Sequence, residues 1–147
     1  MLQFQAVASH VDWEGRIYLI PLTDFENLRI IKKVLDSKYK DSSQGPEDKN
    51  WASGESVIVR WDEDGHWYRG VVMEVNCEEF IVQYVDYGTV EVCRVENMRK
   101  EVFMVTTPIQ CISIELEDVQ PNRENSKINN IICGVANFFF QGCTLFR

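Results

Sequence analysis

The stretch between residues 54 and 99 most constrains what this chain can fold into. Four short segments in it, at 56–61, 67–75, 80–85 and 89–93, are rich in β-branched and aromatic residues, and Asp, Asn or Gly residues separate them. Strands this short, joined by such tight turns, favour a small and strongly bent sheet that closes into a barrel.

The segment before the barrel predicts two strands and a helix. Two β-like runs, at 4–9 and 16–21, surround a turn of polar residues. The Thr23–Glu26 spacing is that of a capping box, and it precedes apolar residues at helical spacing, which are Phe25, Leu28, Ile31, Leu35 and Tyr39. Residues 41–50 are polar and predict a loop that ends this first part.

The segment after the barrel predicts another strand and a second helix. Residues 108–116 alternate between apolar and polar types, as a half-buried strand does. Helical spacing then relates Ile128, Ile131, Ile132, Val135 and Phe139, and residues 143–146 begin a further strand. The fold class that we expect is therefore mainly β with flanking helices.

Charge and hydropathy limit the kinds of partner. The 147 residues carry 15 Lys and Arg against 23 Asp and Glu, a formal net charge of −8. Affinity for nucleic-acid phosphates comes from basic side chains, so this balance argues against direct nucleic-acid binding and favours a cationic partner. The N-terminus indicates no secretory signal, and no apolar run is long enough for us to expect a membrane partner.

The sequence lacks the residue patterns of common enzymes and metal sites. It contains no nucleophile elbow, zinc-protease motif or glycine-rich phosphate loop. The five cysteines, at spacings of 16, 18, 22 and 10 residues, fit neither a zinc pattern nor a disulfide framework. We therefore expect no catalytic residues, no metal and no cofactor, and reduced thiols in a cytosolic protein.

Four aromatic residues of the barrel segment form the candidate site. Trp61 ends one strand and Tyr68 begins its hairpin partner, so the two rings can approach each other. Tyr84 and Tyr87 are three residues apart and converge only if the chain bends between them. The residues alone leave two interpretations open: a cage for a cation such as methylated Arg or Lys, or the core of a small sheet.

An ordered set of motifs across this segment resembles the signature of the tudor domain. The motifs are V-I-V-R-W at 57–61, G-H-W-Y-R-G at 65–70, Q-Y-V-D-Y-G at 83–88 and V-E-N-M-R at 95–99. The flanks are similar to the extended form of the family, in which an SH3-like tudor barrel is inserted into a staphylococcal-nuclease-like (SN-like), OB-type domain.

The resemblance implies three parts. Residues 1–50 would be the N-terminal part of the SN-like domain, with two strands, a helix and a loop. Residues 51–104 would be the barrel, and residues 105–147 would be the C-terminal part, a strand and a helix. The family normally continues for several more strands, so we expect this last part to be truncated.

The resemblance also assigns the site residues. The aromatic cage of the family falls on Trp61, Tyr68, Tyr84 and Tyr87. Thr89 stands where arginine-binding members have an Asn that accepts a hydrogen bond from the methylated guanidinium. Because a threonine hydroxyl is shorter than an amide side chain, we expect weaker binding, and the preferred methylation state stays open.

Three further residues are implied to support the cage. Arg69 and Asp86 match a family pair that forms a structural salt bridge, and Gly88 belongs to the bend beside it. Trp67 lies on the opposite face of its strand from Tyr68, so we expect it in the core.

The function that the resemblance implies is a non-enzymatic module that binds symmetric dimethylarginine in Arg-Gly-rich protein tails. The implied partners are PIWI-family proteins of germline small-RNA silencing, in cytoplasmic ribonucleoprotein granules, and the module would be a monomeric part of a larger protein. Two alternatives remain: a tudor-fold scaffold with a weak or non-functional cage, and single-stranded nucleic-acid binding on the OB-type surface, against which the net charge counts.

Overall fold

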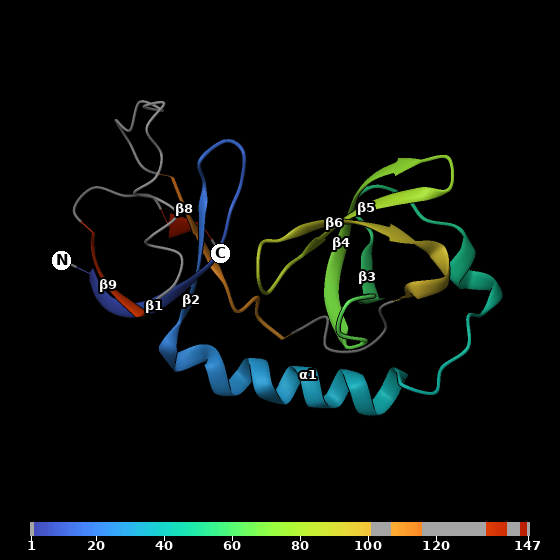
Figure 1. Ribbon diagram of the computed structural model, residues 1–147, viewed down its shortest axis with the longest axis horizontal. Coiled ribbons are helices and arrows are strands. Elements are labelled where there is room, and N and C mark those ends of the chain that lie inside the picture. Colours follow the sequence, from blue (N-terminus) through green and yellow to red (C-terminus); the bar gives the residue numbers. More distant parts are fainter. Residues whose placement is uncertain (1, 101–106, 116–134, 141–144, 147) are drawn as a thin grey trace.

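Two antiparallel five-stranded sheets and one long α-helix make up the described part of the protein (Figure 1). The computed structural model describes residues 2–100, 107–115, 135–140 and 145–146. The flanking sheet has the strand order β10-β8-β2-β1-β9, and the central sheet has the order β6-β5-β4-β3-β7. A mainly β fold is therefore confirmed, with a single helix in the described part of the chain.

The two sheets draw on different parts of the sequence. The flanking sheet consists of β1 (Leu2–Val11), β2 (Ile17–Pro21), β8 (Ile112–Ile114), β9 (Val135–Phe140) and β10 (Leu145–Phe146). The central sheet consists of β3 (Ser56–Arg60), β4 (Trp67–Asn76), β5 (Glu79–Tyr84), β6 (Val90–Arg94) and β7 (Met98–Lys100). The chain thus leaves the flanking sheet after β2, completes the central sheet, and returns to the flanking sheet at β8.

The β1–β2 hairpin lies close to its predicted position. Asp12 closes the turn, since its Oδ1 accepts hydrogen bonds from the backbone N–H groups of Glu14 and Arg16, at 3.0 and 2.8 Å. Ala6, Leu19 and Ile114 bury their side chains almost completely in the core of this sheet.

Helix α1 (Phe25–Tyr39) runs along both sheets, as the long blue helix of Figure 1 shows. Its buried residues are Leu28, Ile31, Leu35 and Tyr39, whereas Phe25 is 43% exposed. The predicted capping box does not form. A 3-10 turn at Leu22–Asp24 precedes the helix, the Thr23 hydroxyl donates to the Asp24 carboxylate, and no side chain caps the first turn.

The central sheet has a core of its own and also packs on α1. Val57, Val59, Val72, Val82 and Met98 are fully buried inside it. On its other face, Ile58 and Trp67 pack against Ile31, Leu35 and Tyr39 of the helix. The prediction of Trp67 as a core residue is therefore confirmed, and its alternation with Tyr68 sends the two rings to opposite faces.

The second predicted helix is wrong over the residues that the structure describes. Residues 135–140 form β9, which pairs antiparallel with β1 from Leu2↔Phe140 to Val7↔Val135. Residues 128–134 lie outside the described residues. Helical spacing in a short apolar run does not separate a helix from a strand, and here β1 offers an edge whose backbone groups need partners.

Two smaller outcomes complete the fold. The strand expected at the end of the chain is present as β10, which pairs with β8. Asp48, in a 3-10 turn at Pro46–Lys49, fixes the predicted loop, because its carboxylate accepts hydrogen bonds from the N–H groups of Gly45 and Lys100. Within the described residues, no helix is long and apolar enough to cross a membrane.

Candidate functional site: an aromatic pocket

The four predicted aromatic residues meet around one pocket of the central sheet. The pocket has a volume of about 220 Å³ and is lined almost entirely by apolar atoms. Its lining residues are Trp61, Tyr68, Tyr84, Tyr87, Thr89 and Glu91. All five residues that the sequence assigned to the binding site are among them.

Tyr68 is the central ring of this pocket. Its centroid lies 6.4 Å from that of Trp61 and 5.6 Å from those of Tyr84 and Tyr87. The interplanar angles of the three pairs lie between 77° and 81°, so each pair is edge-to-face. This arrangement suits the quadrupoles of the rings and places them as walls on different sides of one space.

A hairpin turn places the first two rings. Tyr68 pairs with Val59 across β3 and β4, and Trp61 follows directly after β3. The Trp61 N–H donates to the His66 carbonyl at 3.0 Å, which closes the turn between them. We call Trp61 and Tyr68 the hairpin wall of the pocket.

A tight bend places the other two rings, which we call the turn wall. The N–H groups of Tyr87 and Gly88 both donate to the Tyr84 carbonyl, at 3.1 and 2.8 Å. Gly88 has a φ of 83°, a left-handed conformation that most residues avoid. The chain reverses at this point, and Tyr84 and Tyr87 therefore line the same pocket despite their odd spacing.

The flanking sheet supports this bend directly. Ser9 Oγ of β1 donates to the Tyr87 carbonyl at 2.6 Å, and Gln83 Nε2 donates to the Tyr18 hydroxyl at 3.1 Å. A Cβ atom on Gly88 would lie 2.1 Å from the Tyr18 ring. The glycine is therefore required for close packing between the bend and β2, as well as for its backbone angle.

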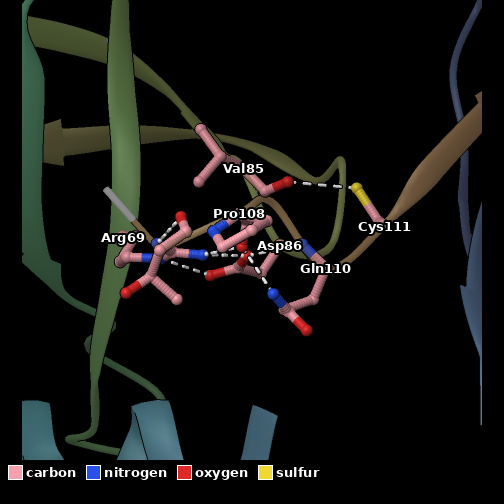
Figure 2. Close-up of polar contacts among 7 residues, drawn as sticks. Arg69, Val85, Asp86, Pro108, Gln110 and Cys111 are labelled. Carbon is pink, nitrogen blue, oxygen red and sulfur yellow. Dashed lines mark hydrogen bonds and ion pairs between the residues drawn. The ribbon is translucent and has the colours of Figure 1, made fainter. Parts of the chain in front are cut away.

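Arg69 and Asp86, each next in sequence to a tyrosine of the pocket, form a buried ion pair (Figure 2). The Arg69 guanidinium donates to both Asp86 oxygens, from Nε at 2.8 Å and from Nη2 at 2.6 Å. The two residues are 6% and 2% exposed. Such a bidentate pair fixes the distance between β4 and the bend that carries Tyr87.

The same pair ties both elements to the segment that leads into β8. Arg69 also donates to the carbonyls of Thr107 and Pro108, at 2.7 and 2.9 Å. Asp86 Oδ1 accepts the N–H of Gln110 at 3.0 Å (Figure 2). Arg69 and Asp86, which the sequence predicted as structural support, are thus brought together. The role of residues 107–110 in holding this pair was not predicted.

The pocket tyrosines are neutral phenols at physiological pH. Burial raises the pKa of Tyr84 and of Tyr87 above the ordinary value. Burial also raises the pKa of Tyr68, with a further contribution from a hydrogen bond to Asp64. Neutral, electron-rich rings are what an aromatic site for a cation requires.

Glu91 is the lining residue that sequence reasoning missed. It lies on β6, two positions after Thr89, and side chains two apart share a face in the strand that the sequence predicts at 89–93. Extending that alternation from Thr89 would have found it. Within the described residues, the Glu91 carboxylate makes no hydrogen bond or ion pair.

Nothing in the described part of the chain resembles a metal centre. No group of three or more His, Cys, Asp or Glu side chains there is placed to hold a metal ion. The residues around the pocket supply four aromatic rings, the aliphatic hydroxyl of Thr89 and the carboxylate of Glu91.

Comparison with known proteins relates the whole fold to one family. The family model of the Tudor domain matches residues 1–118. RING finger protein 17 of Mus musculus is 31% identical over 119 residues, which are 80% of this chain and 7% of that protein. The chain thus spans less than a tenth of this curated relative.

Solved structures of extended Tudor domains share the fold. The extended Tudor domain TD3 of mouse TDRD1, in complex with a MILI peptide containing dimethylarginine, has a TM-score of 0.76 at 19% identity, covering 92% of this chain and 74% of that one. The complex of Tudor with symmetrically dimethylated Aubergine also has a TM-score of 0.76, at 15% identity, and covers 99% and 93% of the two chains. The chain therefore belongs to the Tudor domain family, and its fold is that of an extended Tudor domain.

Proposed function

We propose that this domain is a non-enzymatic reader that binds methylated arginine through its aromatic pocket. The observation that carries the proposal is the convergence of Trp61, Tyr68, Tyr84 and Tyr87 around one pocket. A cation against an aromatic face gains about 0.5–2 kcal/mol. Methylation keeps the charge of the guanidinium and makes it easier to remove from water, so a methylated arginine suits these walls better than an unmodified lysine.

The polar residues of the pocket favour an arginine that keeps N–H groups. A symmetrically dimethylated guanidinium still has one N–H on each terminal nitrogen. Thr89 and Glu91 both line the pocket, and their hydroxyl and carboxylate would accept hydrogen bonds from these N–H groups. Glu91 would also supply a countercharge to the bound cation.

The relatives support the class of partner. The ligands in two related structures are dimethylarginine peptides of MILI and Aubergine, and a third contains an N-terminal Piwi peptide. We infer that the ligand of this chain is an Arg-Gly-rich tail of a PIWI-type protein, carrying symmetric dimethylarginine, in the cytoplasmic granules of germ cells. The module would act as a monomeric part of a longer protein, with avidity from neighbouring modules.

The proposal also divides the chain into a scaffold and a barrel that carries the pocket. Residues 1–50 and 105–147 would form an SN-like scaffold, and residues 51–104 would form the barrel that carries the pocket. The strand order supports this division, since every strand of the central sheet lies between Ser56 and Lys100.

Calorimetry with matched peptides tests the proposal. An Arg-Gly peptide with one symmetric dimethylarginine should bind with a dissociation constant of about 10⁻⁵ M, and the unmethylated peptide at least about tenfold more weakly. Trp61→Ala should abolish the difference, whereas Trp13→Ala, which removes a 92% exposed indole outside the pocket, should preserve it.

Two results would point elsewhere. Equal or absent binding of both peptides would favour a scaffold with a non-functional pocket. Binding of a single-stranded oligonucleotide with a steep salt dependence would favour the nucleic-acid alternative.

A further inference from the structure

A carboxylate outside the pocket lining contacts its central ring. The Tyr68 hydroxyl donates to Asp64 Oδ2 at 2.5 Å, and Asp64 Oδ1 accepts the backbone N–H of His66 at 2.9 Å. Lys32 of α1 faces the same place, with its Nζ 4.0 Å from Asp64 Oδ2 and 5.5 Å from the centroid of the Tyr68 ring. The carboxylate is thus held by hydrogen bonds within its own turn, and the Lys32 ammonium lies nearby at the limit of ion-pair distance.

Tyr68 is the ring through which this contact can affect the whole pocket. It is the shared member of the three edge-to-face pairs with Trp61, Tyr84 and Tyr87. A change in its orientation would alter its contact with each of the other walls. The group that fixes the Tyr68 hydroxyl therefore helps to fix the shape of the site.

We propose that Asp64 is a positioning residue of the aromatic pocket: its carboxylate orients Tyr68 and makes that ring more attractive to a cation. The inference rests on the proposed function for the identity of the ligand. No sequence pattern points to this role, because three consecutive acids in a turn are usually a solvated surface.

The physical basis is a charge-assisted hydrogen bond. An O–H···O⁻ contact near 2.5 Å is short and strong for a protein, and it polarises the donor. Electron density moves from the phenol oxygen into the ring, which strengthens the negative face that attracts cations. Partial burial opposes the charge of Asp64, but hydrogen bonds from Tyr68 and His66 outweigh it and lower the pKa, so the acceptor is a charged carboxylate at neutral pH.

A pair of neighbouring substitutions separates this contact from the general acidity of the turn. Asp64→Asn keeps the shape of the side chain and removes its charge, and we expect it to weaken dimethylarginine-peptide binding by about threefold. Glu63→Gln makes the same charge change at an exposed neighbour that is not part of the pocket lining, and we expect nearly unchanged affinity. Equal losses in the two variants would overturn the inference.

A double-mutant cycle tests whether Asp64 acts through the Tyr68 hydroxyl. In Tyr68→Phe the ring remains and the donor is absent, so adding Asp64→Asn should cost no further affinity. Independent losses in the double variant would mean that Asp64 does not act through this hydrogen bond.

A measurement without ligand keeps this inference separate from the proposed function. The NMR resonance of the Tyr68 hydroxyl-bearing ring carbon, assigned by its loss in Tyr68→Phe, reports the hydrogen bond of the phenol. It should shift in Asp64→Asn and remain in place in Glu63→Gln. An unchanged resonance would refute the role of Asp64, whereas failure of the wild-type domain to bind the methylated peptide would refute the proposed function.

Discussion

The two walls of the aromatic pocket are held in different ways. The hairpin wall depends on contacts within one turn, with α1 and with β6, and several of these contacts are exposed to solvent. In the ion pair between Arg94 of β6 and Asp62 of the turn, for example, the side chains are 71% and 54% exposed. The turn wall depends on Arg69 and Asp86, which are buried, and on close packing against the flanking sheet. Solvent weakens the first kind of contact and not the second, so the turn wall should be the rigid half of the site.

The largest expected effect comes from breaking the buried pair of the turn wall. Arg69→Ala leaves the Asp86 charge buried without its partner and should lower the free energy of unfolding by about 3–5 kcal/mol. Urea denaturation followed by tryptophan fluorescence measures this. Arg94→Ala removes the exposed partner of Asp62 and should cost less than about 1 kcal/mol. Similar losses in both variants would remove the contrast between the walls.

A smaller loss of stability is expected from adding a methyl group at Gly88, where the bend packs closely against Tyr18. Gly88→Ala combines strain at a φ of 83° with a Cβ placed 2.1 Å from the Tyr18 ring, and it should cost about 2–4 kcal/mol. Gly15→Ala is the matched control, because Gly15 has a φ of 86° and a Cβ added there would meet no atom within 4 Å. Gly15→Ala should therefore cost only the backbone strain, about 1 kcal/mol. Equal melting temperatures for the two variants would contradict close packing at the bend.

The residue after the bend offers a gain of affinity. Thr89→Asn lengthens the acceptor on the side of the turn wall, and it should tighten binding of a symmetric dimethylarginine peptide by about tenfold. Calorimetry with mono-, symmetric and asymmetric dimethylarginine peptides would also give the preferred methylation state. Thr89→Val is the matched control, since it keeps the shape and removes the acceptor. A Val variant that binds as tightly as the Asn variant would show that this position contributes no hydrogen bond.

Acid should weaken the ion pair that Asp62 contributes to the hairpin wall. Hydrogen bonds from Arg94 and then Asn97 lower the pKa of Asp62 below its ordinary value. Its contribution to stability is therefore complete above the unfolded-state pKa, about 3.9, and is lost as the pH falls through the lower folded-state value. Because the pair is exposed, the contribution should be less than about 1 kcal/mol. The unfolding free energies of wild type and Asp62→Asn should converge toward pH 2, and a constant difference would contradict this.

The smallest expected effect is at the helix side of the hairpin wall. Lys32 places an ammonium 5.5 Å from the Tyr68 centroid, where it repels a second cation. Lys32→Met should therefore tighten binding of the methylated peptide by about twofold. Lys33→Met removes the neighbouring, exposed charge and serves as the control. Weaker binding in Lys32→Met would mean that this lysine supports the wall.

Local patterns account for what the sequence could predict. The strands of the central sheet and the bend between Tyr84 and Tyr87 follow from short β-like runs and from a glycine at a turn. The aromatic residues of the pocket were found because they lie in ordered motifs of a known family. Glu91 could have been predicted by strand alternation, since it lies two positions after Thr89 in the strand expected at 89–93, and both residues line the pocket.

Long-range packing accounts for what the sequence could not predict. Ser9 and Tyr87, joined by a hydrogen bond, are 78 residues apart, and no local signal relates them. The strand at Val135–Phe140 was mistaken for a helix because its conformation is set by pairing with β1, at the other end of the chain. The contact between Asp64 and Tyr68 depends on a side-chain orientation that alternation alone does not specify.

The contacts of Arg69 bear on how this domain can be engineered. Its guanidinium is covered by the carbonyls of Thr107 and Pro108, which follow the last strand of the central sheet. A shortened domain cut at residue 104 would lack those carbonyls and the Gln110 N–H, and would expose a charged pair to solvent near the aromatic pocket. A fragment intended for grafting or for chimeric proteins should therefore retain residues 107–110 and the strands of the flanking sheet that contact the bend.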